Sequence, residues 1–144
     1  MINLNGLDLW QRKEISWLPR RAQASKLLFP RVTRKSFEMQ ARVRELRPGW
    51  LKKGYDLHLG VGMAAGYATI GTIGFEGRMD YAAVGKVTIL ASRLSSEANG
   101  GQILTDQKTL SKVEHFVEAE PLKELQLKGF NRPTTVFNIL GLRC

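Results

Sequence analysis

Hydrophobic positions recur at helical intervals in two segments of the chain. The stretch "SFEMQARVREL" opens with Ser36 and spaces Met39, Val43 and Leu46 three to four residues apart. This pattern predicts a helix that Ser36 caps and that ends before the following Pro-Gly pair. A second helix is predicted for residues 86–98, where the Asn-Gly-Gly run that follows would end it.

Strand patterns surround these helices. Bulky residues alternate with small ones over residues 57–63, and the small residues after them suggest a turn, so residues 57–74 are predicted to form a buried β-hairpin. A short strand is expected at 102–104, then a short helix capped by Thr105 or Asp106, and two strands joined at 131–133. The order of elements predicts an α/β (α+β) fold in which helices pack on a sheet.

The basic residues are concentrated in the first third of the chain. Residues 1–54 hold 13 Lys and Arg against 4 Asp and Glu, whereas residues 55–144 hold 9 of each. Residues 1–34 fit neither period, and Pro19 and Pro30 are expected to interrupt any long helix there. We therefore divide the chain into a basic N-terminal segment of unassigned structure, 1–34, and one domain, 35–144. Nucleic-acid binding by the basic part is a weak alternative, because it carries no groove-reading motif.

The composition also indicates whether the chain is expected to cross a membrane and in which cellular compartment it is expected to lie. Residues 57–75 carry no formal charge and approach the length of a membrane span, but they include five glycines and alternate with period two. We therefore expect no membrane span. The single cysteine, Cys144, excludes a disulfide within the chain, and no apolar secretory signal is recognised at the start, so a cytoplasmic location is expected.

The Gly85-Lys86 pair invites comparison with a phosphate-binding loop. Such a loop needs a glycine five residues before the pair and Ser or Thr directly after it, but this chain has Asp80 and Val87 there. The spacing excludes this loop. His58 and His115 show no metal-ligand spacing either.

The helix at 86–98 has a narrow apolar stripe that is expected to face the core. Ile89 and Arg93 lie on its opposite side, one turn apart. Two interpretations stay open: Ile89 is a scattered surface residue, which is common, or this face meets a partner subunit or a ligand. The apolar stripe consists of Val87, Leu90, Ala91, Leu94 and Ala98.

Residues from about 36 to 140 resemble the C-terminal two thirds of a class III adenylate/guanylate cyclase catalytic domain. The resemblance rests on "GVGMAAGYATIGTIGFEGRMDYAAVG", "VTILASRLSSEANGGQIL" and "LKGFNRPTTVFNIL" in this order. It implies conversion of ATP or GTP to the 3′,5′-cyclic nucleotide by a homodimer or heterodimer. It also implies two Mg²⁺ or Mn²⁺ ions held by two aspartates, with an arginine and an asparagine from the other subunit's helix.

Carried over by position, the resemblance assigns the charge-stabilising arginine to Arg93. Ile89 replaces the ribose-binding asparagine, and Ala82 occupies the base-selecting position. The family's N-terminal strand and metal-binding hairpin have no counterpart in residues 1–35, where Asp8 is the only aspartate and its context does not fit.

The resemblance thus predicts a partial cyclase fold without metal ligands. Such a chain would be inactive alone and could lend Arg93 to a partner that brings the aspartates. The alternative is a non-catalytic dimerisation or regulatory partner of a complete cyclase. The missing strand should also leave an unpaired edge beside 57–74, unless residues 1–34 or a partner cover it.

Overall fold

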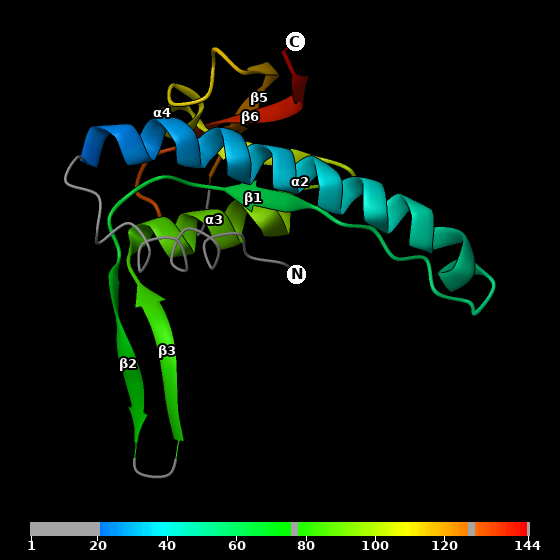
Figure 1. Cartoon of the computed structure of the whole chain (residues 1–144), viewed down its shortest axis with the longest axis horizontal. Helices are drawn as coiled ribbons and strands as arrows, with labels where there is room; N and C mark the ends of the chain where they lie inside the picture. The colour runs from blue at the N-terminus through cyan, green and yellow to red at the C-terminus, as the bar shows by residue number, and fades with distance from the viewer. Residues whose placement is uncertain (1–20, 76–77, 127–128, 144) are drawn as a thin grey trace.

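The computed structural model describes residues 21–75, 78–126 and 129–143 (Figure 1). Three helices and six strands are found in this part of the chain. Their bounds are α2 (Arg21–Leu51), β1 (Val61–Met63), β2 (Thr69–Phe75), β3 (Arg78–Val84), α3 (Lys86–Glu97), β4 (Ile103–Asp106), α4 (Gln107–Leu110), β5 (Val117–Leu125) and β6 (Thr134–Leu142).

The strands form two separate sheets. The main sheet has the order β1-β4-β6-β5, in which β1 and β4 are parallel and the other two pairs are antiparallel. Strands β2 and β3 pair only with each other among the described strands, and their hairpin projects away from the rest of the molecule (Figure 1). Helices α2 and α3 lie on opposite sides of β1 (Figure 1). The fold is therefore mixed α and β, as the sequence predicts.

The residue types in strand β1 fit the helices that pack on its two faces. Val61 and Met63 point to the α2 side, where they join the main hydrophobic core. Gly62 points to α3, and a Cβ atom at this position would lie 2.2 Å from the backbone nitrogen of Ser95. Glycine is therefore what allows α3 to approach the strand so closely.

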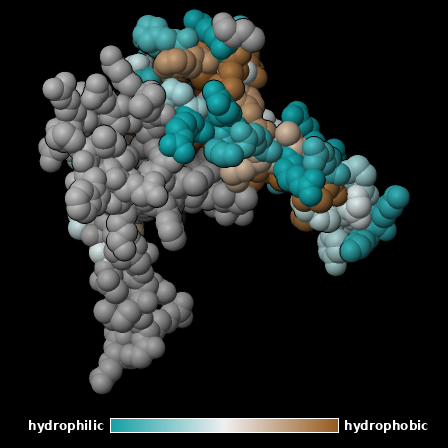
Figure 2. Space-filling view, in the orientation of Figure 1, coloured by the Kyte–Doolittle hydropathy of each residue, from teal (hydrophilic) through white to brown (hydrophobic). Residues whose placement is uncertain are grey.

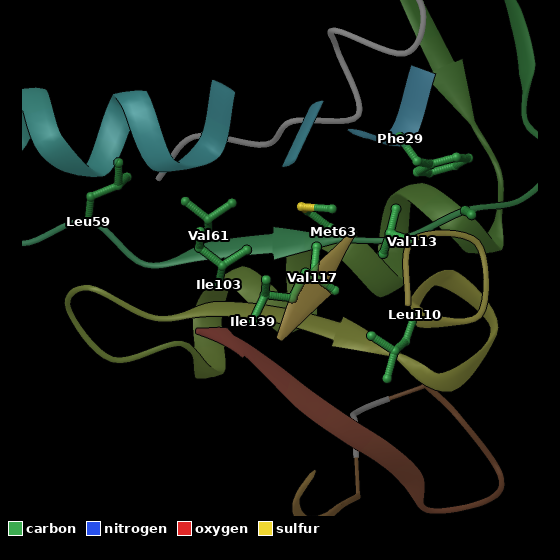
Figure 3. Close-up of a cluster of buried hydrophobic side chains, with 10 residues drawn as sticks. Phe29, Leu59, Val61, Met63, Ile103, Leu110, Val113, Val117 and Ile139 are labelled. Atoms are coloured by element: carbon green, nitrogen blue, oxygen red, sulfur yellow. The ribbon is translucent and has the colours of Figure 1, made fainter. Parts of the chain in front are cut away.

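The main core lies between α2 and the sheet (Figure 3). Side chains from both parallel strands and from the segment after α4 meet there, and Val61, Ile103 and Val113 are fully buried. A smaller cluster fills the α3 face of the sheet, built on Leu94, Leu104 and Val136. The sheet is thus apolar on both faces near β4.

Buried polar side chains on α2 also face the sheet, and each of them forms a hydrogen bond. The Gln40 side-chain amide donates hydrogen bonds to the carbonyl oxygens of Leu59 (2.8 Å) and Gln102 (3.3 Å). The Thr33 hydroxyl donates to the Phe29 carbonyl at 2.8 Å. Gln40 therefore ties the helix to the two segments that lead into β1 and β4.

The predicted start and end of the first helix are wrong. Helix α2 begins at Arg21, passes through Pro30 and Pro48, and ends at Leu51. Ser36 does not cap it, because the Ser36 hydroxyl lies inside the helix and donates to the Val32 carbonyl at 2.9 Å. The helix runs without a break across residues 34 and 35, and the division into 1–34 and 35–144 stays a prediction.

The predicted hairpin at 57–74 is also wrong. Strand β1 pairs with β4 rather than with the segment that follows it, and β2 pairs with β3 in the register Thr69↔Val84 to Phe75↔Arg78. Strand β3 (Arg78–Val84) has no counterpart among the strands predicted from the sequence. The helix at 86–98, the strand at 102–104 and the Asp106 cap are confirmed, since the Asp106 carboxylate accepts a hydrogen bond from the backbone N–H of Thr109 at 3.2 Å.

Among the helices that the structure describes, none combines the length and the apolar character needed to cross a bilayer.

Candidate functional site on the outer face of α3

Gly85 is the N-cap residue of helix α3, and packing against the chain around it fixes its position. The Gly85 carbonyl accepts hydrogen bonds from the backbone N–H groups of Thr88 (3.2 Å) and Ile89 (3.4 Å) and from the Thr88 hydroxyl (2.7 Å). A Cβ atom at Gly85 would lie 2.9 Å from the Tyr67 carbonyl oxygen. The Gly-Lys pair is therefore a tightly packed helix start and not a phosphate-binding loop.

The inner face of α3 sets its rotation about the helix axis. Ala91 and Leu94 are completely buried against the sheet, as the apolar stripe predicts. The Ser95 hydroxyl donates to the Gly60 carbonyl at 3.3 Å and so fixes the helix against the strand segment. This rotation turns Ile89 and Arg93 outward.

Ile89 and Arg93 are both exposed, one turn apart on the outer face of α3. Ile89 exposes 49% of its surface, and its side chain has no hydrogen-bonding group. Arg93 forms no ion pair with any residue that the structure describes. Its guanidinium group is thus available to an anionic group from outside the chain.

Two further hydrophobic residues are exposed near the start of α3, and the sequence analysis missed both. Tyr67 is 83% exposed and Val84 is 56% exposed, and both lie in segments that meet at Gly85. Each is a single apolar residue beside small ones, so periodicity gives no signal for it. We call Tyr67, Val84, Ile89 and Arg93 together the α3 outer surface.

Ala82 lies on a different element from the other two predicted site residues. It belongs to β3 and pairs with Gly71 of β2. Its side chain is outside the part that the structure describes. The structure thus brings Ile89 and Arg93 together on one helix face and places the backbone of Ala82 in the projecting hairpin.

The two aspartates whose side chains the structure describes, Asp56 and Asp106, have partners within the chain. Asp56 accepts from the Arg47 guanidinium at 2.9 and 3.0 Å and lies 3.2 Å from the Nε2 atom of His58. The Arg47 hydrogen bonds, helped by His58, hold the pKa of the Asp56 carboxyl below its usual value. The Asp106 carboxylate caps α4 and also binds the Thr109 hydroxyl.

Within the described ranges, no group of three or more His, Cys, Asp and Glu residues could hold a metal ion.

Comparison with known proteins identifies the fold family. Residues 24–141 match the family described as the Adenylate and Guanylate cyclase catalytic domain. No curated protein sequence matched the chain.

Two crystal structures are similar to most of this chain. They are the adenylyl cyclase CyaB from P. aeruginosa (29% identity, TM-score 0.73) and the guanylyl cyclase Cya2 (29% identity, TM-score 0.72). The similarity covers 84% of this chain and 63% of the CyaB chain, and 80% of this chain and 59% of the Cya2 chain. This chain thus spans less than two thirds of either relative. With well over half of its residues matched, the chain belongs to the adenylate and guanylate cyclase catalytic domain family.

Proposed function

We propose that this chain acts as one half of a nucleotide cyclase dimer. The α3 outer surface would meet a second cyclase domain, and Arg93 would stabilise the charge that develops on the phosphates of a nucleoside triphosphate bound between the two domains. The substrate would be ATP, giving cyclic AMP, or GTP, in a cytoplasmic signalling enzyme.

The observation that carries this proposal is the outward position of Arg93 one turn from the exposed Ile89, on a helix that begins next to two further exposed apolar residues. Ile89, Val84 and Tyr67 expose 49, 56 and 83% of their surfaces. An exposed apolar side chain next to an arginine on one helix face is typical of a protein interface. An arginine in such a place loses contact with water when the partner binds, so its attraction for phosphate increases.

We further propose that the chain alone does not form cyclic nucleotide. Of the described aspartates, Asp56 accepts a hydrogen bond from Arg47 and Asp106 accepts one from Thr109. At the ribose-binding position, Ile89 can neither donate nor accept a hydrogen bond. A partner domain would therefore have to bring the metal-binding carboxylates.

A complementation assay tests the role of Arg93. The catalytic domain of the relative CyaB is prepared with alanine in place of its own helix arginine, mixed with this chain, and supplied with Mn²⁺ and ATP or GTP. Cyclic nucleotide is then measured by chromatography. We expect activity to reappear with the unchanged chain and to fall about 10²–10³-fold with Arg93→Ala, the usual cost of losing one charge-stabilising donor.

The matched control is Arg132→Ala, which removes an exposed arginine from the turn between β5 and β6. This variant should restore activity as well as the unchanged chain does. Equal activity of the Arg93→Ala and Arg132→Ala mixtures would refute the role of Arg93. Cyclic nucleotide formed by the chain alone, and lost with Arg93→Ala, would refute the proposed inactivity.

The alternative is a non-catalytic partner that binds a cyclase through the same surface. The exposed Ile89 favours it, because an isoleucine at a substrate position contributes to association but not to ribose binding. An Ile89→Asp variant should then weaken association with the CyaB domain, measured by light scattering, while circular dichroism stays unchanged. Phe116→Asp is the control, since Phe116 is 47% exposed in the segment before β5.

A further inference from the structure

The two edges of the main sheet are built differently. On the β5 edge, Glu118, Glu120 and Glu124 are exposed, Pro121 lies within the strand, and the register shifts at two places. Charged side chains, proline and bulges are the features with which proteins prevent a sheet edge from pairing with another strand. Strand β5 is thus a protected edge.

Strand β1 has none of these features. Its three residues, Val61 to Met63, are all buried, and the buried run extends from there to Ala65. The strand contains no charge and no proline, and its pairing with β4 is regular. Apolar residues packed on both faces are characteristic of a strand from the interior of a sheet.

The hydrogen bonds of β1 show which of its backbone N–H and C=O groups could pair with an additional strand. The Val61 N–H donates to the Gln102 carbonyl at 3.0 Å, and the Leu59 carbonyl accepts from the Gly101 N–H at 2.9 Å, so these groups point toward β4. Because successive residues of a strand point their backbone groups to opposite sides, those of Gly62 point away from β4. No strand in the described part of the chain pairs there.

The C-terminal part of α2 extends beyond the N-terminal start of β1 (Figure 1) and carries exposed apolar residues there. Leu46 and Leu51 are 40 and 47% exposed, and in the segment that leads back to β1, Tyr55 and Leu57 are 60 and 49% exposed. Figure 2 shows hydrophobic residues among the hydrophilic ones in this projecting part. A helix that extends beyond its sheet with apolar side chains exposed has room for further structure beneath it.

The lengths of the relatives suggest what belongs there. This chain covers 63% of the CyaB chain and 59% of the Cya2 chain, so more than a third of each relative has no counterpart in the matched region. Of the two sheet edges, only β1 has the composition of an interior strand.

We propose that the free side of β1 binds an extended segment of a complementary cyclase-domain fragment, the part that the relatives have and this chain does not match. The added strand would pair with the backbone of Gly62, and the projecting part of α2 would cover its apolar side chains. Strand addition of this kind gains affinity from main-chain hydrogen bonds and specificity from alternate side chains. The inference rests on the fold and is independent of any role of Arg93.

The test uses the full chain and the fragment of CyaB that this chain does not match. The two are mixed without nucleotide, and hydrogen exchange is followed by mass spectrometry. Within the peptide that spans residues 59–65, we expect the Gly62 amide, which points away from β4, to exchange at least about tenfold more slowly with the fragment, while the amides of 117–125 do not change. Protection at 117–125 instead of 59–65, or no binding at all, would overturn the proposal.

Two further outcomes would show that something other than the CyaB fragment pairs with the free side of β1. If those amides of β1 that point away from β4, that of Gly62 above all, are already protected in the chain alone at low concentration, the edge is occupied within the chain and the proposal is wrong. If their protection grows with the concentration of the chain alone, a second copy pairs with β1, which also overturns it.

Exposed variants locate the binding surface without disturbing the core. Leu57→Asp should weaken binding of the fragment at least about tenfold, because it places a charge beside the added strand. The control Leu140→Asp alters a residue of β6 that is 54% exposed, and it should bind normally. Equal binding by both variants would place the fragment elsewhere. Arg93→Ala should also bind the fragment normally, which separates this result from the complementation assay.

Discussion

At the scale of single residues, two basic side chains of the described part approach the carboxylate of Asp56. Arg47 lies near the end of α2, and its guanidinium donates two hydrogen bonds to one oxygen of Asp56, while His58 approaches the same oxygen. The Arg47 and Asp56 side chains expose 39 and 57% of their surfaces. Water and salt therefore screen the pair, and its contribution to stability is small.

The pKa of Asp56 should respond directly to Arg47. Because the folded-state pKa lies below its usual value, the favourable interaction is present at neutral pH and is lost as the pH falls through that lowered pKa. We expect Arg47→Met to raise the pKa of Asp56 toward its usual value, as measured by NMR titration of the carboxyl carbon. Arg42→Met is the control, since Arg42 pairs with Glu45 instead. An unchanged Asp56 titration in Arg47→Met would contradict the assignment.

At the scale of elements, the contact between β1 and α3 leaves no free space. A Cβ atom at Gly62 would lie 2.2 Å from the Ser95 nitrogen and 2.3 Å from the Ala91 carbonyl oxygen. Both neighbours are backbone atoms of a helix, so no side chain can rotate to make room. The orientation of α3, and with it the outward position of Arg93, depends on this contact.

We expect Gly62→Ala to reduce the free energy of unfolding by about 1–3 kcal/mol or more, because the added methyl group forces α3 away from the sheet. Urea denaturation followed by circular dichroism measures the change. The matched control is Gly71→Ala, since a Cβ atom at Gly71 meets nothing within 4 Å. A Gly62→Ala protein as stable as the control would show that α3 is not held where the structure places it.

The same contacts explain which elements could be predicted from the sequence. The apolar stripe of α3 depends on neighbours within one helix, so periodicity revealed it together with the outward face of Ile89 and Arg93. The partner of β1 could not be predicted in this way, because β4 lies far along the chain and pairing is a tertiary property. The start of α2 was hidden because Pro30 suggested a break and because buried polar residues such as Gln40 weaken its apolar pattern. Tyr67 and Val84 join the α3 outer surface only through the contacts at Gly85.

At the scale of the whole molecule, a packed centre carries two projecting parts (Figure 1). The centre consists of the main sheet between α2 and α3, with its buried side chains on both faces. One projection is the β2–β3 hairpin, and the other is the C-terminal end of α2. Both projections extend beyond the packed centre, so we expect both to depend on partners for their stability.

Hydrogen exchange should distinguish the hairpin from the centre. A two-stranded hairpin is at best marginally stable in water, so the amides of residues 69–75 should exchange at least about a hundredfold faster than those of β4 and β6, where opening requires loss of the core. Mass spectrometry of the chain alone gives both rates.

Because the hairpin leads directly into Gly85 and α3, a domain that binds the α3 outer surface should also slow exchange in residues 78–84. The Ile89→Asp variant should lose this protection and keep that of β4 and β6. Fast exchange throughout the central strands would instead show that the sheet is not formed without a partner, and the role of the missing cyclase segment would then extend from function to folding.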